Sequence, residues 1–188
     1  MQKFWILATV LLFPVVSGCA AVVVGGVAAG TMVATDRRSS GAYADDESIE
    51  WKTSYTIREK FGDKVHVNVT SFNRIVLLTG EAPTEEIRGE IQKIAQGMES
   101  VREVRNEIVV GKPTTLATWS DDSYLTTKVM ANMLGKKDLN SYYVKVITED
   151  GVVYLMGLVT RKEGDAAAEV ASTTTGVRKV VKVFEYMD

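Results

Sequence analysis

The side chains with the widest chemical range are one thiol and one imidazole, since the 188-residue sequence holds a single cysteine, Cys19, and a single histidine, His66. A thiol is a nucleophile that can be alkylated, and Cys19 has no second cysteine in the chain with which to form a disulfide. His66 alternates with valines and shares the polar side of that pattern with Asn68 and Thr70. This alternation predicts a solvated, structural role for His66.

Carboxylates gather at two predicted helix starts, Asp45–Glu47 and Asp121–Asp122. Capping and the helix dipole account for acidic residues at such positions. The sequence shows no P-loop, nucleophile elbow or Cys/His metal-ligand spacing. We therefore expect a protein that is not an enzyme and that binds no metal or other cofactor. A formal charge of −2 and the lack of a recognition motif also argue against a nucleic-acid partner.

The residues before Cys19 indicate what its thiol is for. A short basic start, Met1–Lys3, precedes an apolar run over residues 4–16, which is short for a membrane span but typical of a secretory signal. The stretch that follows, Val16–Cys19 ("VSGC"), resembles a bacterial lipobox. The resemblance implies cleavage before Cys19 and acylation of its sulfur and its amine. We expect a signal peptide over residues 1–18 and a firm lipid anchor on Cys19, because several acyl chains hold a protein at a membrane.

Ala20 bears on the membrane in which that anchor lies. In lipoprotein signals of this kind an aspartate after the cysteine favours the inner membrane, so Ala20 implies an outer-membrane protein facing the periplasm. An uncleaved anchor helix is the alternative, because residues 4–35 carry no charge, but Pro14 and Gly25 weaken a continuous helix. We expect residues 19–44, rich in small residues, to form the lipidated N-terminus and a flexible tether.

The rest of the chain contains an internal repeat. "VNVTSFNRIVLLTGEA", residues 67–82, matches "VKVITEDGVVYLMGLV", residues 144–159, and "VREVRNEIVV", residues 101–110, matches "VRKVVKVFEY", residues 177–186. Such self-similarity predicts a duplicated unit. We expect a first domain over residues 45–110, a linker over 111–120 and a second domain over 121–188.

Each unit is predicted to run helix, strand, strand, helix, strand. In the first unit Ile49, Thr53 and Ile57 recur at helical spacing, and the alternating residues 65–69 indicate a half-buried strand. The remaining elements are predicted as strands over 75–79, 101–110, 143–148, 152–157 and 179–184, and as helices from Pro83, from Asp121 or Asp122, and over 165–174. The fold class is therefore α+β, with two helices on one face of a three-stranded mixed sheet in each domain.

The order of elements, the unit length and the glycine after each second strand, Gly80 and Gly157, resemble the BON domain. With the lipobox, the chain is similar to outer-membrane lipoproteins that carry two BON domains. The resemblance implies a membrane-attaching module that is not a catalyst. It implies anionic phospholipid as a partner (phosphatidylglycerol or cardiolipin), with outer-membrane or division-site proteins as further partners. The role that it implies is upkeep of outer-membrane integrity, at its most specific at the division site.

The first helix of the second unit carries the candidate lipid-binding residues. At 100° per residue its core face is Leu125, Val129 and Met133, while Tyr124 and Lys128 fall on the outer face. A tyrosine suits the boundary between apolar and wet surroundings, and a lysine stem can lie on acyl chains while its ammonium group meets phosphate. The candidate set is Tyr124, Thr127, Lys128, Val129, Leu134 and Lys136, with Val129 supporting the helix. A solvated outer face is the alternative.

Two aromatic residues of the first unit, Trp51 and Tyr55, fall opposite the core face of its first helix. Outward aromatics one turn apart predict a covered surface. The second unit, a protein partner or the membrane could cover it, and we expect packing between the domains, with Trp119 of the linker. The alternative function for the chain as a whole is a periplasmic interaction scaffold for envelope assembly, in which lipid serves only as the anchor on Cys19.

Overall fold

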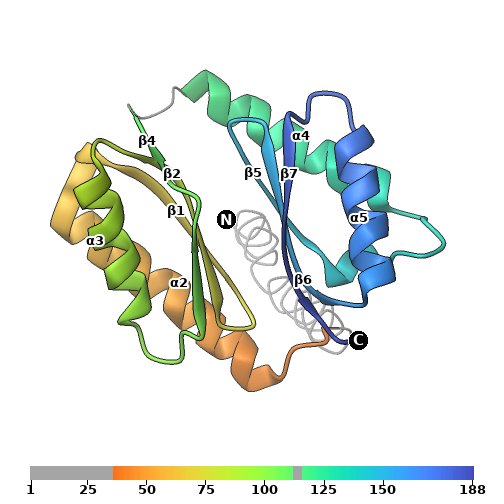
Figure 1. Ribbon diagram of the computed structural model, residues 1–188, viewed down its shortest axis with the longest axis horizontal. Coiled ribbons are helices and arrows are strands. Elements are labelled where there is room, and N and C mark those ends of the chain that lie inside the picture. The colour runs from red at the N-terminus through yellow and green to blue at the C-terminus, as the bar shows by residue number, and fades with distance from the viewer. Residues whose placement is uncertain (1–35, 112–115) are drawn as a thin grey trace, which may run out of the picture. The chain divides into compact units, whose positions relative to one another are not determined.

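A computed structural model describes residues 36–111 and 116–188, and of residues 116–120 it describes the backbone alone. Cys19, the predicted signal peptide and most of the predicted tether lie outside the described residues. Arg37–Asp188 form one compact unit, in which two α+β domains follow one another as the duplicated sequence predicts. In each domain the two helices lie on one side of the sheet (Figure 1).

The first domain follows the predicted order of elements. Its elements are α2 (Ser40–Phe61), the 3-10 turn η1 (Gly62–Lys64), β1 (His66–Phe72), β2 (Ile75–Ala82), α3 (Glu85–Gln96), β3 (Glu103–Asn106) and β4 (Val109–Val110). β1 pairs antiparallel with β2, while β3 and β4 pair parallel with β2. The last predicted strand is thus divided in two, and between its parts the Asn106 side chain accepts the N–H of Ile108.

The second domain repeats this topology. Its elements are α4 (Leu116–Met133), η2 (Ser141–Tyr143), β5 (Lys145–Glu149), β6 (Val152–Val159), α5 (Arg161–Thr173) and β7 (Lys179–Tyr186). β5 is antiparallel and β7 parallel to β6, so the mixed sheet and the α+β class are confirmed. α4 begins inside the predicted linker. α5 begins before its predicted start, because Thr160 and Glu163 form a capping box there.

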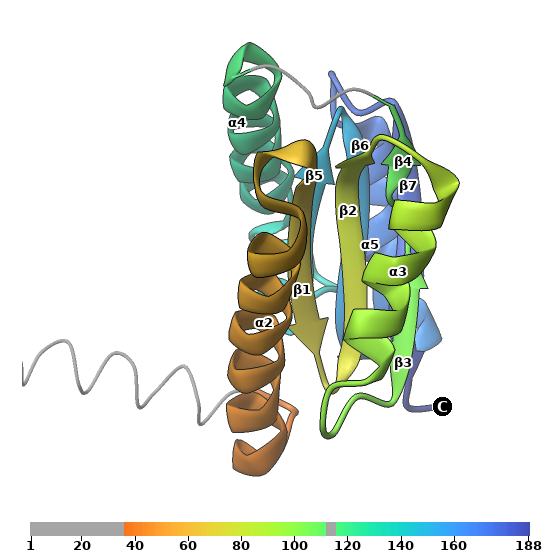
Figure 2. The ribbon, with the colours of Figure 1, turned by 90° about the vertical axis from the view of Figure 1, so that its left-hand side faces the viewer.

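Each domain buries an apolar core between its helices and one face of its sheet. In the first domain Ile49 and Ile57 of α2 and Ile91 of α3 pack on Val76 and Leu78 of β2. Figure 2 shows α2 running alongside β1 in this layer. The second domain has an equivalent core with Leu125, Val129 and Met133 of α4, Val153 and Leu155 of β6, and Ala167 and Ala171 of α5. The helical spacing of apolar residues therefore identified the buried faces correctly.

The glycine shared by the two second strands is required by a close backbone approach. A Cβ atom at Gly80 would overlap the carbonyl oxygen of His66, and one at Gly157 would overlap that of Tyr143. Gly80 also has φ +103°, which side chains disfavour. Glycine recurs at the two positions because a side chain there would push the second strand away from the backbone of His66 or Tyr143.

A buried aspartate of α2 holds the turn between the first two strands. The Asp46 carboxylate accepts the backbone N–H of Asn73 at 2.8 Å and that of Arg74 at 2.7 Å, and also the Ser71 hydroxyl at 2.6 Å. Asn73 and Arg74 have φ values of 50° and 66°, as the two central residues of a type I′ hairpin turn require. The carboxylate thereby satisfies two backbone N–H groups of the turn. These hydrogen bonds offset the cost of positive φ at two residues that are not glycine.

Asp122 of α4 does the same in the second domain. Its carboxylate accepts the N–H of Asp150 at 2.7 Å and that of Gly151 at 2.8 Å. Predicting these acidic clusters as helix starts was therefore wrong, since Asp46 and Asp122 lie inside longer helices and face the hairpins. The N-cap of α2 is Ser39. The sequence shows that Asp46 and Asp122 are acidic residues of helices. The hairpin turns that they bind come close to them only through tertiary packing.

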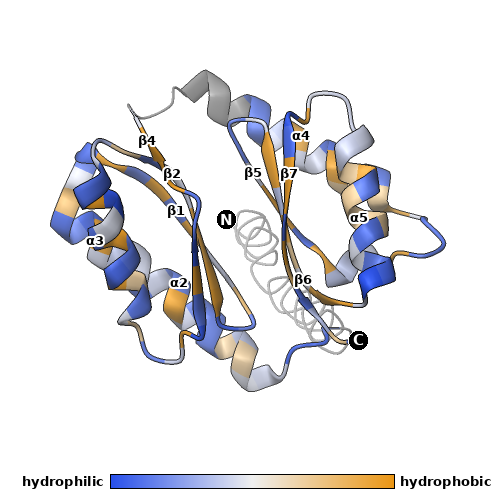
Figure 3. Cartoon of the chain, viewed as in Figure 1, coloured by the Kyte–Doolittle hydropathy of each residue, from blue (hydrophilic) through white to orange (hydrophobic). Residues whose placement is uncertain are grey.

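The second face of each sheet, which the helices leave uncovered, is apolar at its centre. Phe72 and Leu77 of the first domain form a buried cluster with Tyr154, Met156 and Val183 of the second. The hydrophobic colour along β2 and β6 in Figure 3 follows this pattern, because these central strands are apolar on both faces. The two domains are thus held together through their sheets.

The described end of the predicted tether is part of the fold. Arg37 donates to the Glu163 carboxylate at 2.7 and 2.8 Å and to the Leu158 carbonyl at 3.0 Å. Arg38 donates to Asp46 at 2.8 Å, and α2 begins at Ser40. A flexible tether reaching residue 44 is therefore corrected for residues 37–44. Polar composition suggested a solvated segment, whereas the guanidinium groups find carboxylates and carbonyls on both domains.

The turn contact of Asp122 gives the first prediction. Asp122→Asn places an NH2 group among backbone N–H donors, so we expect the free energy of unfolding to fall by about 1–3 kcal/mol. Urea unfolding of residues 37–188, followed by circular dichroism, measures this loss. Asp121→Asn is the matched control, because Asp121 is exposed on the same helix turn. Equal midpoints for the two variants would contradict the role assigned to Asp122.

The ion pair of Arg37 gives the second prediction. The hydrogen bond from Arg37, together with donors at Thr160, lowers the pKa of Glu163 to about 2. Arg37→Gln should raise this pKa toward the ordinary value of 4.5. Because the folded pKa lies below the unfolded one, the stability from this pair is complete above pH 4.5 and is lost as the pH falls toward 2.

An NMR titration of the Glu163 carboxyl carbon in the two proteins tests this shift. Arg178→Gln is the control, because Arg178 pairs with Asp150 in the same domain. A Glu163 titration that is unchanged by Arg37→Gln would remove Arg37 as the cause.

Candidate functional site

The core face of α4 lies where the sequence predicts it. Leu125, Val129 and Met133 are buried in the second core. Val129 has no exposed surface, so it supports the helix from inside and presents nothing to a ligand. The residues that a ligand can reach therefore lie on the other side of α4 and beside its C-terminal end.

The outer side of α4 carries exposed apolar side chains. Tyr124 is 70% exposed and Leu134 63% exposed, and Met130 lies between them at 47%. Tyr142 of η2, 70% exposed, adds a second aromatic ring. We call Tyr124, Met130, Leu134 and Tyr142 the α4–η2 patch. Exposed apolar surface of this kind indicates contact with an apolar partner, because removing it from water is favourable.

A groove of about 310 Å³ opens within this patch. It lies between α4 and η2, and its lining is mostly apolar. The lining residues are Thr127, Met130, Ala131, Met133, Leu134, Ser141, Tyr142 and Val144. Tyr142 was not among the predicted residues, because it lies outside the helix, in η2 after the loop that follows α4. A run of tyrosines at 142–143 beside an apolar strand was the only available signal.

The predicted polar residues lie on α4 and in the turn that follows it. The Lys128 ammonium group donates to the carbonyl of Thr175 at 2.8 Å and remains near the surface. Lys136 and Lys137 are exposed in the turn after α4. The Thr127 hydroxyl donates to the Ser123 carbonyl of its own helix, so its remaining hydrogen-bonding capacity is as an acceptor. The structure thus brings Thr127 and Leu134 together at the groove, whereas Tyr124, Lys128 and Lys136 do not line it.

The corresponding helix of the first domain differs at the positions that matter. Ser54 and Arg58 of α2 occupy the repeat positions of Met130 and Leu134, while Lys52 corresponds to Lys128. A depression of about 400 Å³ beside α2 is lined by polar residues together with Trp51, Tyr55 and Val69. The duplicated helices share their core faces, but the groove beside α4 is mostly apolar, whereas the depression beside α2 also carries charged side chains.

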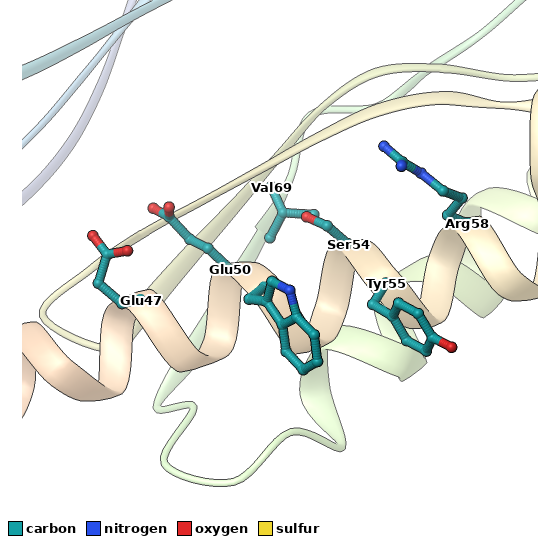
Figure 4. Close-up of a pocket in the computed structure, with 7 residues that line it drawn as sticks. Glu47, Glu50, Ser54, Tyr55, Arg58 and Val69 are labelled. Atoms are coloured by element: carbon teal, nitrogen blue, oxygen red, sulfur yellow. The ribbon is translucent and has the colours of Figure 1, made fainter.

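Trp51 and Tyr55 stack on the surface of α2, with ring centroids 5.6 Å apart and planes at 15°. They are 67% and 53% exposed, so the prediction that they pack between the domains is wrong. The contact between domains runs through the sheets instead, because their uncovered faces are apolar. Figure 4 shows Tyr55 on α2 with Glu50, Ser54 and Arg58 nearby. Trp119 lies in α4, and its side chain is outside the described part of the structure.

Within residues 36–111 and 116–188, none of the helices combines the length and apolar character that crossing a membrane requires.

Comparison with known proteins shows the family to which the chain belongs. The model of the BON domain family matches residues 54–112 and 121–188. The chain is 40% identical over 190 residues to the outer membrane lipoprotein DolP of Haemophilus influenzae, covering 100% of this chain and 97% of that protein.

Two further relatives have different names. The 21 kDa hemolysin of Actinobacillus pleuropneumoniae is 38% identical over 154 residues, with 81% of this chain and 79% of the relative covered. The osmotically-inducible protein Y of Escherichia coli is 28% identical over 156 residues, with 81% and 78% covered. The predicted family resemblance and the outer-membrane location are confirmed. The chain belongs to the BON domain family, as a lipoprotein of the bacterial envelope with two such domains.

Proposed function

We propose that this protein is a non-enzymatic, Cys19-anchored outer-membrane lipoprotein that binds anionic phospholipid through the α4–η2 patch. The observation that carries the proposal is the exposed apolar groove between α4 and η2, on a helix that also carries Lys128 and is followed by the exposed Lys136. Apolar side chains and cations on one helix and the turn after it match the two parts of a lipid, the acyl chain and the phosphate. The biological role that follows is upkeep of outer-membrane integrity, including at the division site.

The apolar part of the interaction comes from the patch. Tyr124 and Leu134 enter the boundary between headgroups and acyl chains, while Met130 and Tyr142 present the groove to an acyl chain. A surface helix binds a bilayer in proportion to the apolar area that it buries. Val129 holds this face in place by filling the core beneath it.

The electrostatic part comes from Lys128 and Lys136. Each lysine near an anionic surface contributes about 1 kcal/mol of attraction. The Lys128 ammonium group can meet a phosphate oxygen while it keeps its bond to the Thr175 carbonyl, because an ammonium group has three donors. Binding should therefore prefer phosphatidylglycerol or cardiolipin to neutral lipid.

A second candidate function rests on the exposed Trp51–Tyr55 stack. Two large aromatic rings open to solvent suit a protein interface. In this alternative the protein is a scaffold for envelope proteins, and lipid serves only as the anchor at Cys19. The two functions use different helices, so variants of α2 and α4 separate them.

Charge reversal tests the electrostatic part. Lys128→Glu should weaken binding of residues 37–188 to phosphatidylglycerol vesicles by about 10- to 30-fold at low salt, since the change amounts to two charges. Vesicle co-sedimentation measures the affinity, and phosphatidylcholine vesicles serve as the reference. Lys52→Glu is the matched control, because Lys52 is exposed at the same repeat position of α2 and the net charge changes equally. Equal losses in the two variants would leave only a general charge effect.

Truncation of Leu134 tests the apolar part. Leu134→Ser should weaken vesicle binding by roughly 5-fold or more, and at moderate salt as well as low salt, because burial of apolar surface is not screened. Val109→Ser is the control, since Val109 is equally exposed but lies on β4. Normal vesicle binding by Leu134→Ser, with loss of a protein partner in Trp51→Ala, would favour the scaffold function.

A further inference from the structure

Two cross-strand pairs place four polar residues on one face of the first sheet. In the antiparallel pairing of β1 and β2, His66 lies opposite Glu81 and Asn68 opposite Thr79. Opposed residues share a face, and so do residues two apart along a strand. This is the face that packs against the second domain, because it also carries Phe72 and Leu77 of the cluster between the domains.

Glu149, at the end of β5 in the second domain, reaches this polar strip. Its Oε2 atom accepts the Asn68 amide at 2.8 Å and the Thr79 hydroxyl at 3.0 Å. Its Oε1 atom lies 4.0 Å from Nδ1 of His66. The same Nδ1 atom is 3.0 Å from Oε2 of Glu81. One imidazole nitrogen thus faces carboxylates from both domains.

The two carboxylates are poorly solvated. Glu81 is 6% exposed and Glu149 9% exposed. Like charges held close together away from water repel each other strongly, and a cation between them removes that cost. His66 can supply one positive charge only when it is protonated. A divalent cation would neutralise both carboxylates and leave the imidazole neutral.

We propose that His66, Glu81 and Glu149 bind a zinc ion that links the two domains. One ligand atom from each residue lies within 4.8 Å of the others. Zinc takes nitrogen and oxygen ligands at about 2.0–2.2 Å in a tetrahedron, which puts its ligands about 3.4 Å apart. The observed 3.0 and 4.0 Å are on either side of that value, and the three atoms lie within 4.8 Å of one another, so zinc binding requires the two carboxylates to turn toward each other.

The surroundings orient the ligands. Asn68 and Thr79 both hold Oε2 of Glu149, which leaves Oε1 on the side of His66. Donors behind a coordinating carboxylate fix its direction in metal sites. The set of one imidazole nitrogen and two carboxylates suits zinc. It suits calcium and magnesium less, because those ions require more oxygen ligands. Water completes the fourth position.

The site contains two ligands from the first domain and one from the second, so full coordination requires the sheets to be packed. Zinc binding should therefore stabilise the packed arrangement, since an ion that binds only the native state shifts the equilibrium toward it. This proposal departs from the expectation that no metal is bound and from the solvated role predicted for His66. The approach of Glu149 to His66 could not be predicted from the sequence, because Glu149 lies in the other domain.

Calorimetric titration of zinc chloride into tag-free residues 37–188 tests the proposal. This segment contains the only histidine of the chain and no cysteine, so the signal has one imidazole source. We expect one zinc ion per chain, bound in the micromolar range or more tightly, and much weaker binding of magnesium. His66→Gln and Glu149→Gln should each weaken zinc binding by about 10-fold or more. Glu85→Gln, which removes an exposed carboxylate on α3, should leave it unchanged.

Circular dichroism of each variant guards against loss of fold, and both glutamine substitutions retain hydrogen-bonding groups. Absence of zinc binding by the folded wild-type protein would overturn the proposal. So would a His66→Gln variant that binds zinc as the wild type does. Loss of binding in His66→Gln but not in Glu149→Gln would overturn the link between the domains.

Discussion

Each domain covers one face of its sheet with two helices and leaves the other face, apolar at its centre, without cover. The two uncovered faces cover each other, since residues of both sheets form one buried cluster: Phe72, Leu77, Tyr154, Met156 and Val183. Removal of apolar area from water is the dominant favourable term in folding. The contact between the sheets therefore determines which surfaces of the two domains are buried and which remain exposed to a ligand or partner. α2 adds one ion pair to this contact, from Glu50 to Lys145, while the outer sides of α2 and α4 carry exposed aromatic side chains.

Duplication followed by divergence explains how one fold acquires different surfaces. The parts that maintain the fold recur in both domains: the glycine of the second strand, the apolar face of the first helix, and the aspartate that holds the hairpin turn. The outer positions of the first helices have changed. Where α2 carries Ser54 and Arg58, α4 carries Met130 and Leu134, and the groove follows from that exchange.

Much of the fold can be predicted from the sequence, because repeats and hydrophobic periods report local structure. The core face of α4 and the mixed sheets were correct for that reason, although the last strand of the first sheet is divided into β3 and β4. The features that were missed depend on residues distant in the chain. Asp46 and Asp122 were placed at helix starts, since nothing local reveals the turns that they bind. Tyr142 at the groove and Glu149 beside His66 likewise come together only through tertiary packing.

The most direct test of the account is a residue-by-residue map of lipid contact. Amide NMR spectra of residues 37–188 would be recorded with and without micelles that contain phosphatidylglycerol, at low and moderate salt. The account predicts that the largest shifts lie along the outer side of α4, from Tyr124 to Leu134, and at Ser141 and Tyr142 of η2, while α2 changes little. Shifts centred on Trp51 and Tyr55, or no shifts with any lipid, would contradict it and favour a protein-binding scaffold.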